Sequence, residues 1–292
     1  MTDLDNTPRT GATGQQGNDP LLLRDTAVDT AVLAARRITD KRVELGDIRQ
    51  FATTKSSAVD PVTVVDTMAE DFIADRLETQ RPGDGLIGEE GTARESVTGV
   101  SWIIDPIDGT VNFLYGLPQY AVSIGAAIDG EVVAGAVVNV ASGAVYAAAR
   151  GAGATRTLAG ETVSLQVNRL SDVSQALLAT GFAYSGTRRR AQAAALGRVL
   201  PIVRDIRRMG SAALDLCALA EGSVDAYYEH GINCWDYAAG ALIAAEAGAV
   251  VKAPTLSTPG VAGEITLAAA GDVYPALRQL LEEQGIMAAL PR

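Results

Sequence analysis

Helical and extended patterns of apolar residues alternate in the first part of the chain. Apolar positions near helical spacing predict a helix over 20–45. A polar loop is expected at 47–59. The β-branched run at 61–65 predicts a strand, and Asp66 follows it as the expected N-cap of a helix over 66–79.

Strand patterns dominate the middle of the chain. Apolar runs predict strands at 86–88, 102–105, 120–128, 131–140 and 144–149. Asp129–Gly130 and Ser142–Gly143 separate the last three runs, and both dipeptides are typical of tight hairpin turns. We therefore expect an antiparallel meander here.

Helices and strands alternate again in the second half. The predicted helices cover 188–203, 211–221, 235–247 and 274–284, and the predicted strands cover 177–180, 224–228 and 265–269. Strands grouped first and alternation afterwards favour an α+β protein whose sheets are layered with helices.

The first 19 residues differ in composition from the rest. They contain few apolar side chains and are predicted to be a disordered tail. The folded domain is accordingly expected over 20–292, with lobes of about 20–152 and 153–292.

Charge and composition narrow the classes of function. With 24 basic and 35 acidic residues, the chain has a formal charge of −11, which repels phosphate backbones and argues against nucleic-acid binding. The apolar run at 238–251 is interrupted by Glu246 and is too short to span a membrane. The polar N-terminus is unlike a secretory signal, so we expect a cytoplasmic protein. A single histidine argues against His-based catalysis.

The segment WIIDPIDGT at 102–110 carries the strongest chemical signal. Asp105 ends a predicted strand, Pro106 interrupts the strand ladder, and Asp108 follows. Two carboxylates that converge on one point repel each other, and a hard cation such as Mg²⁺ or Ca²⁺ offsets that repulsion. Gly109 and Thr110 then open a short helix whose free N–H groups could bind an anion. The segment indicates a phosphate held beside metal ions.

A DxxDG segment on its own can also be a turn in which Asp caps a helix. The remaining acids favour the metal site. Glu89 and Glu90 end one predicted strand, Asp66 ends another, and Asp236 follows Trp235 at the start of a helix. Acids at several separate element ends suit a site built from oxygen ligands.

Together these motifs resemble the inositol monophosphatase family of magnesium-dependent, lithium-sensitive sugar phosphatases. The matching segments are KSSAVDPVTVVD (55–66), IGEEG (87–91), WIIDPIDGTVNF (102–113), MGSAALDLC (209–217) and DAYYEHGINCWDYAAG (225–240). The resemblance implies a layered α/β/α/β/α fold, with an antiparallel sheet in the first half and a mixed sheet in the second, and a homodimer.

The resemblance also implies a set of metal ligands. It assigns Glu89, Asp105 and the backbone carbonyl of Ile107 to a first metal ion. Asp105, Asp108 and Asp236 would hold a second ion. A third, weaker ion near Glu89 would bring the total to two or three Mg²⁺ per site.

Catalytic and substrate-binding roles follow from the same resemblance. Asp66 and Thr110 match the pair that orients and helps to deprotonate the attacking water, and Glu89 is counted with them. The residues expected to bind substrate are Gly109 and Thr110 for the phosphate, by backbone N–H groups, and Gly210, Ser211, Ala212 and Glu229 for the inositol ring. Glu229 could instead be a solvated acid at a strand end.

The sequence thus predicts a Mg²⁺-dependent phosphomonoesterase that hydrolyses myo-inositol 1-phosphate to myo-inositol and phosphate by metal-activated water. Two related activities stay open: a broader sugar phosphatase that includes fructose 1,6-bisphosphatase, and a histidinol-phosphate phosphatase. The small phosphorylated polyol is the expected partner. A non-enzymatic alternative is a protein-interaction role with the transcription machinery, because some bacterial relatives attach to it.

Overall fold

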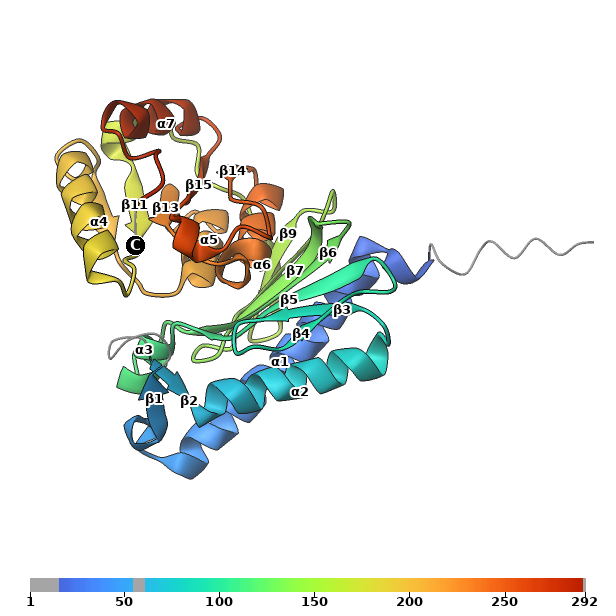
Figure 1. Ribbon diagram of the computed structural model, residues 1–292. Helices are drawn as coiled ribbons and strands as arrows, with labels where there is room; N and C mark the ends of the chain where they lie inside the picture. The colour runs from blue at the N-terminus through green and yellow to red at the C-terminus, as the bar shows by residue number, and fades with distance from the viewer. Residues whose placement is uncertain (1–15, 55–60, 291–292) are drawn as a thin grey trace, which may run out of the picture.

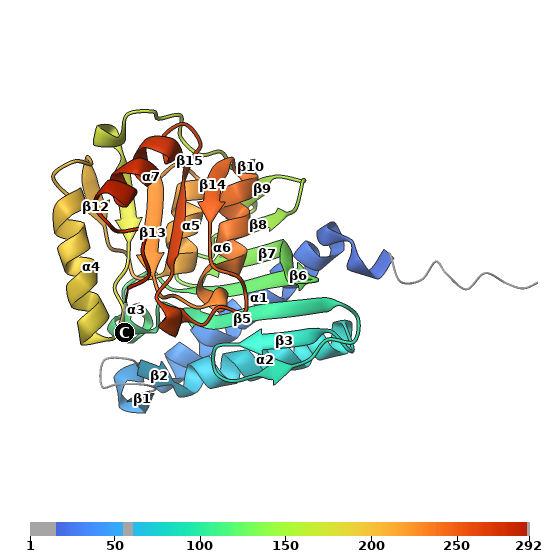
Figure 2. The ribbon, with the colours of Figure 1, turned by 45° about the horizontal axis from the view of Figure 1, so that its top comes forward.

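Helices cover the faces of a larger and a smaller β-sheet in the computed structural model, which describes residues 16–54 and 61–290 (Figures 1 and 2). The α-helices are α1 (Pro20–Leu45), α2 (Val64–Gln80), α3 (Thr110–Tyr115), α4 (Gly186–Val199), α5 (Ala212–Ala220), α6 (Cys234–Glu246) and α7 (Tyr274–Glu283). The short 3₁₀ helices are η1 (Gln16–Asn18), η2 (Ile48–Phe51), η3 (Val173–Gln175) and η4 (Gly260–Ala262).

The larger sheet comes from the middle of the chain. Its strands, in spatial order, are β10 (Glu161–Ser164), β9 (Ala154–Leu158), β8 (Val145–Ala149), β7 (Glu131–Asn139), β6 (Ala121–Ile128), β5 (Val100–Asp108), β3 (Gly85–Gly88) and β4 (Ala93–Arg94). All neighbours are antiparallel except β3 and β5, which run parallel. The meander expected from the hairpin dipeptides is confirmed.

The smaller sheet comes from the second half. Its order is β12 (Asp205–Arg207), β11 (Leu177–Thr180), β13 (Ala226–His230), β15 (Ile265–Ala270) and β14 (Ala249–Lys252). Strands β12, β11 and β13 are parallel, whereas β15 pairs antiparallel with both β13 and β14. This is the mixed sheet that the sequence predicts. A separate small ladder joins β1 (Ala52–Thr54) to β2 (Pro61–Thr63).

The layers follow one another in a fixed order (Figures 1 and 2). Helices α1 and α2 cover the outer face of the larger sheet, α5 and α6 lie between the sheets, and α4 and α7 cover the outer face of the smaller sheet. The predicted α+β class and its α/β/α/β/α layering are therefore confirmed. No helix of the described ranges is long and apolar enough to cross a membrane.

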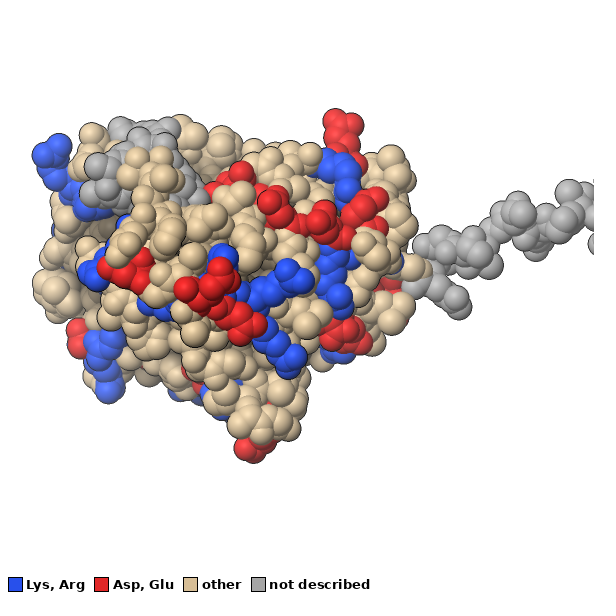
Figure 3. All heavy atoms as spheres, turned by 90° about the horizontal axis from the view of Figure 1, so that it is seen from below, with Lys and Arg blue, Asp and Glu red and all other residues tan. Residues whose placement is uncertain are grey.

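The outer face of α1 and α2 is polar. Seen from below, this side of the molecule interleaves acidic and basic side chains (Figure 3). Beneath them, Leu23, Ile38, Ile73 and Trp102 are almost fully buried in a core shared with the larger sheet. Each helix thus turns a narrow apolar stripe inward and a charged face outward, the usual division for a helix on one face of a sheet.

Several local predictions are wrong. The run at 61–65 ends as a strand at Thr63, because α2 already begins at Val64. Thr63, and not Asp66, is the N-cap of α2, and Asp66 occupies the third position of the helix. The helix predicted over 188–203 starts at Gly186 and ends at Val199.

Two further predicted segments are described only in part by the structure. The expected loop at 47–59 contains η2 and β1, and its residues 55–60 lie outside the described residues. Of the predicted tail, residues 1–15 also lie outside the described residues, whereas Gly17 of η1 accepts a hydrogen bond from Arg81, the residue that follows α2. The division into lobes stays a prediction.

Small side chains set the distance between α6 and the larger sheet. A Cβ added at Gly135 of β7 would lie 2.9 Å from the Cα of Ala239, and one added at Gly125 of β6 would lie 3.3 Å from the Cβ of Ala238. Helix α6 therefore packs directly on β6 and β7.

Replacing Gly135 with alanine should therefore lower the free energy of unfolding by about 1–3 kcal/mol, because the added methyl group meets backbone that cannot yield. Gly197→Ala is the matched control, since no atom lies within 4 Å of a Cβ there and the site is inside α4. That variant should gain about 0.5–1 kcal/mol. Urea unfolding of both variants checks the prediction, which equal shifts would contradict.

Candidate active site and metal centre

A β-bulge in β5 turns Asp105 and Asp108 toward the same place. Residues three apart on a regular strand point to opposite faces of the sheet. Here Asp105 lies opposite Ser123 and Asp108 opposite Ala121, so β5 contains one residue more than β6 between these pairs. The extra residue restores a common side for the two carboxylates. The sequence signal for this bulge is Pro106, which cannot donate to the ladder.

Asp236 joins them from the start of α6. One carboxylate oxygen each of Asp105, Asp108 and Asp236 lies within 4.8 Å of the others. The sequence-predicted acids therefore meet, although about 130 residues separate Asp105 from Asp236 along the chain. We refer to these three residues as the acid cluster.

Backbone N–H groups hold each member of the acid cluster. Ile107 donates to Asp105 Oδ1 at 3.0 Å, Ala213 to Asp108 Oδ2 at 2.7 Å, and Asn233 to Asp236 Oδ2 at 2.6 Å. The hydroxyl of Ser211 also donates to Asp108 Oδ2, at 2.6 Å. Bonds of this kind fix where each carboxylate points and favour its charged form.

Burial acts against those bonds. It raises the pKa of Asp105 and of Asp236 well above the usual range, and repulsion from Glu89 and Asp108 adds to the effect. Burial raises the pKa of Asp108 to about 6, while the bonds from Ser211 and Ala213 oppose the shift. Asp105 and Asp108 are buried and Asp236 is half-buried. Three neighbouring carboxylates whose negative charges repel one another suit a hard divalent cation, which prefers oxygen ligands.

Glu89 lies in the turn after β3 and lines the same pocket. Glu70 of α2, which the sequence analysis missed, holds that turn. Its buried carboxylate accepts hydrogen bonds from the N–H groups of Glu90 at 2.7 Å and Thr92 at 2.8 Å. Gly88 leaves room for it, since a Cβ there would lie 2.5 Å from the carboxylate. The available signal was its position four residues after Asp66, one helical turn away.

Asp66 and Thr110, the predicted catalytic pair, are in contact. The Thr110 hydroxyl lies 3.2 Å from Asp66 Oδ1 and 3.2 Å from the Ile107 carbonyl, and can donate to either. Asp66 Oδ2 accepts from the backbone N–H of Thr63 at 2.9 Å and from its hydroxyl. One carboxylate oxygen of Asp66 thus caps the N-terminus of α2, and the other faces the Thr110 hydroxyl.

Gly109 provides the turn from β5 into α3. Its φ of 97° lies in the left-handed region, and a Cβ would lie 2.8 Å from the Gln119 carbonyl. Both constraints require glycine. Gly109 lines the pocket, whereas Thr110 is buried beneath it and contacts Asp66.

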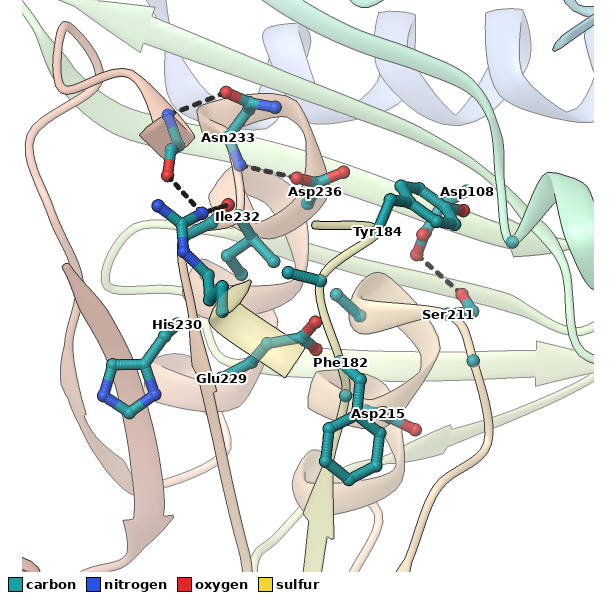
Figure 4. Close-up of a pocket in the computed structure, with 18 of the residues that line it drawn as sticks. Asp108, Phe182, Tyr184, Ser211, Asp215, Glu229, His230, Ile232, Asn233 and Asp236 are labelled. Carbon is teal, nitrogen blue, oxygen red and sulfur yellow. Dashed lines mark hydrogen bonds between the residues drawn. The ribbon is translucent and has the colours of Figure 1, made fainter. Parts of the chain in front are cut away.

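The pocket has a volume of about 420 Å³, and side chains from different parts of the chain line its two ends (Figure 4). Asp108 and Asp236 lie toward one end, and Glu229, Phe182 and Asp215 toward the other. The remaining predicted ring contacts also line it: Gly210, Ser211 and Ala212. The structure therefore brings the predicted phosphate end and the predicted ring end into one cavity.

Glu229 is held at the ring end. The Tyr227 hydroxyl donates to Glu229 Oε2 at 3.0 Å, and Gly181 faces the carboxylate at a point where any Cβ would overlap it. Burial raises the pKa of Glu229 to about 7, and the bond from Tyr227 opposes the shift. These contacts give it a fixed position in the pocket, unlike a solvated acid at a strand end.

The comparisons with known proteins agree with this geometry. The model of the inositol monophosphatase family matches residues 22–289. The chain belongs to the inositol monophosphatase family. This confirms the resemblance inferred from the motifs and the expectation that the protein is a phosphatase.

Individual relatives span most of the chain. It is 49% identical over 287 residues to "Inositol-1-monophosphatase SuhB" of Mycobacterium tuberculosis (strain ATCC 25618 / H37Rv), an alignment of 94% of this chain and 98% of the relative. The solved structure of "Mycobacterium tuberculosis SuhB" superposes with a TM-score of 0.81 at 46% identity, covering 93% and 100% of the two chains. The "Nus factor SuhB" of Pasteurella multocida is 38% identical over 229 residues, 77% of this chain and 84% of the relative.

Replacing Glu70 with alanine should loosen the turn that carries Glu89. Two partly buried N–H groups lose their acceptor, so the free energy of unfolding should fall by roughly 1–3 kcal/mol, and amide exchange at Glu90 and Thr92 should speed up. Glu78→Ala is the control on the same helix, because its exposed ion pair with Arg94 contributes less than about 1 kcal/mol. Equal exchange rates in the two variants would refute the assignment.

Proposed function

We propose that the protein is a Mg²⁺-dependent phosphomonoesterase that hydrolyses myo-inositol 1-phosphate to myo-inositol and phosphate. The acid cluster carries the proposal, because two of its members, Asp108 and Asp236, line one end of a pocket whose other end presents Glu229. A phosphate with a polyhydroxylated ring has the two kinds of group that these ends can bind.

The metal ligands proposed are those of the resemblance. Glu89, Asp105 and the Ile107 carbonyl would hold one Mg²⁺, and Asp105, Asp108 and Asp236 a second; a third ion is proposed near Glu89. When bound, Mg²⁺ lowers the pKa of a coordinated water and stabilises negative charge on the phosphate and leaving oxygens.

The side chains have separate tasks in this proposal. Asp66 and Thr110 orient the attacking water and accept its proton, using the Asp66 oxygen that faces the Thr110 hydroxyl. The N–H groups of Gly109 and Thr110 bind the phosphate. At the far end, Gly210, Ser211 and Ala212 contact the ring, and Glu229 accepts a hydrogen bond from a ring hydroxyl.

A broader sugar phosphatase, active on fructose 1,6-bisphosphate, and a histidinol-phosphate phosphatase use the same acid cluster. The position of Glu229 favours a substrate with hydroxyl groups at the end far from the phosphate. The homodimer and the cytoplasmic location stay predictions.

A second candidate is a protein-interaction role, favoured by the similarity to a relative named Nus factor SuhB. This role and catalysis respond differently to loss of a cluster acid, because binding to a protein partner needs no metal ligand. The two candidates are therefore separable with one variant.

Asp105→Asn should lower turnover at least about 100-fold, because it removes an acid expected to hold both metal ions. The assay is phosphate release from inositol 1-phosphate, fructose 1,6-bisphosphate, histidinol phosphate and adenosine 3′,5′-bisphosphate, with Mg²⁺ or with EDTA. The fold should persist, since the change relieves repulsion among buried acids.

Asp84→Asn is the matched control, a buried acid that accepts from Trp102 Nε1 at 2.9 Å outside the pocket. It should lose stability and keep Mg²⁺-dependent turnover. Full activity of Asp105→Asn would overturn the metal assignment, and no release from any substrate by wild type with bound Mg²⁺ would favour the interaction role.

Glu229→Gln should lower kcat/KM for inositol 1-phosphate relative to ethyl phosphate by about tenfold. A neutral amide accepts a weaker hydrogen bond from the ring hydroxyl, and ethyl phosphate has no hydroxyl to lose. Steady-state kinetics on the two substrates give the ratio. A ratio equal to that of wild type would remove Glu229 from ring binding.

A further inference from the structure

Asp215 is a buried acid in the substrate pocket to which the proposed mechanism gives no role, although it lies within the segment MGSAALDLC (209–217). It lies in the first turn of α5, is 1% exposed and lines the pocket together with Glu229 (Figure 4). Its Oδ1 has no hydrogen-bond partner in the part of the chain that the structure describes.

Other buried aspartates of this protein are satisfied internally. Asp84 accepts from the Trp102 indole, and Asp108 from Ser211 and Ala213. Asp225 accepts from Asn168 Nδ2 and from the N–H of Leu177, both at 2.8 Å. Asp215 departs from this pattern. A buried carboxyl oxygen without a hydrogen-bond donor destabilises the fold. A molecule bound in the pocket could supply the missing donor.

None of the described groups around Asp215 donates a hydrogen bond to this buried oxygen. Tyr227, on the strand facing α5, gives its hydroxyl to Glu229. Burial, with repulsion from Glu229 and Asp108, raises the pKa of Asp215 well above the usual range, and the exposed Arg208 at the pocket opposes this shift. Asp215 therefore shares the ring end of the pocket with a second acid and needs a hydrogen-bond donor.

We propose that Asp215 is a specificity-determining residue whose carboxyl group accepts a hydrogen bond from a hydroxyl of the substrate, different from the hydroxyl that Glu229 accepts. This inference rests on the proposed function and deepens it. The substrate class is a phosphate ester of a polyol with at least two free hydroxyls at the end far from the phosphate. An alcohol with a single hydroxyl there would leave one of the two acids without a donor.

The test compares wild type with Asp215→Asn and Asp215→Leu on inositol 1-phosphate and ethyl phosphate. The leucine variant should lower the ratio of the two kcat/KM values about tenfold, since the site then offers no acceptor. Its melting temperature should stay equal or rise, because an unpartnered buried carboxyl is replaced by an apolar group of similar size. If the leucine variant fails to fold, the asparagine variant, which keeps the shape, gives the ratio.

Deoxy analogues identify the hydroxyl. Wild type should discriminate by about tenfold against one monodeoxy-inositol 1-phosphate, and Asp215→Leu should abolish that discrimination while Glu229→Gln abolishes discrimination at a different position. Asp225→Asn is the matched control, a buried aspartate outside the pocket that should lose stability and keep the wild-type ratio.

An unchanged ratio in Asp215→Leu, or equal loss on every analogue, would overturn the inference. Failure of the proposed function is visible separately, in wild type: if it prefers another polyol phosphate of the panel, the Asp215 comparison is made on that substrate. If wild type shows no preference for any polyol phosphate over ethyl phosphate, both the substrate assignment and the Asp215 inference are wrong.

Discussion

Repulsion between buried carboxylates is the constraint that organises this protein. One carboxylate oxygen each of Asp105, Asp108 and Asp236 lies within 4.8 Å of the others, and the first two side chains are buried while the third is half-buried. Such an arrangement persists only if the framework is stiff enough to resist separation. The bulge in β5 supplies two of the acids, and the start of α6 supplies the third. Each acid accepts a hydrogen bond from a backbone N–H group, so the backbone fixes the direction in which each carboxylate points.

The layered fold supplies that stiffness through close packing. Glycine on β6 and β7 and alanine on α6 let the middle helix layer approach the larger sheet until backbone meets side chain. Helix α5 begins beside α6 and contributes Ser211 and Ala213 to Asp108. The site consequently stands where a strand end and two helix starts converge, and a shift in any one layer would change the spacing of the acids.

Much of this could be read from the sequence, and the exceptions have physical reasons. Asp105, Asp108 and Asp236 stand in compact motifs at element ends, where local patterns are informative. Glu70 and Asp215 lie inside helices, and the sequence pattern gives neither acid a role, although Asp215 belongs to the segment MGSAALDLC (209–217). Only the three-dimensional packing shows what the two side chains face. The short strands β9, β10 and β12 were missed because they are polar and lie at or near sheet edges, where period-two alternation is weak. The N-cap of α2 was misplaced because Thr63 and Asp66 can each cap a helix, and the β-branched run concealed where the helix starts.

The hydrogen bonds of Asp66 and Asp236 affect how far these two acids, found in a related sequence, indicate catalytic activity. Each acid is the third residue of its helix and accepts the N–H of the residue that precedes the helix, Thr63 or Asn233. The same carboxylate thus caps the N-terminus of a helix and belongs to the candidate site. A related protein without hydrolase activity would still need both acids for stability, because loss of either one would destabilise the first turn of a helix. Presence of these two acids in a sequence is therefore a weaker sign of catalysis than presence of Asp105, whose carboxylate closes no helix.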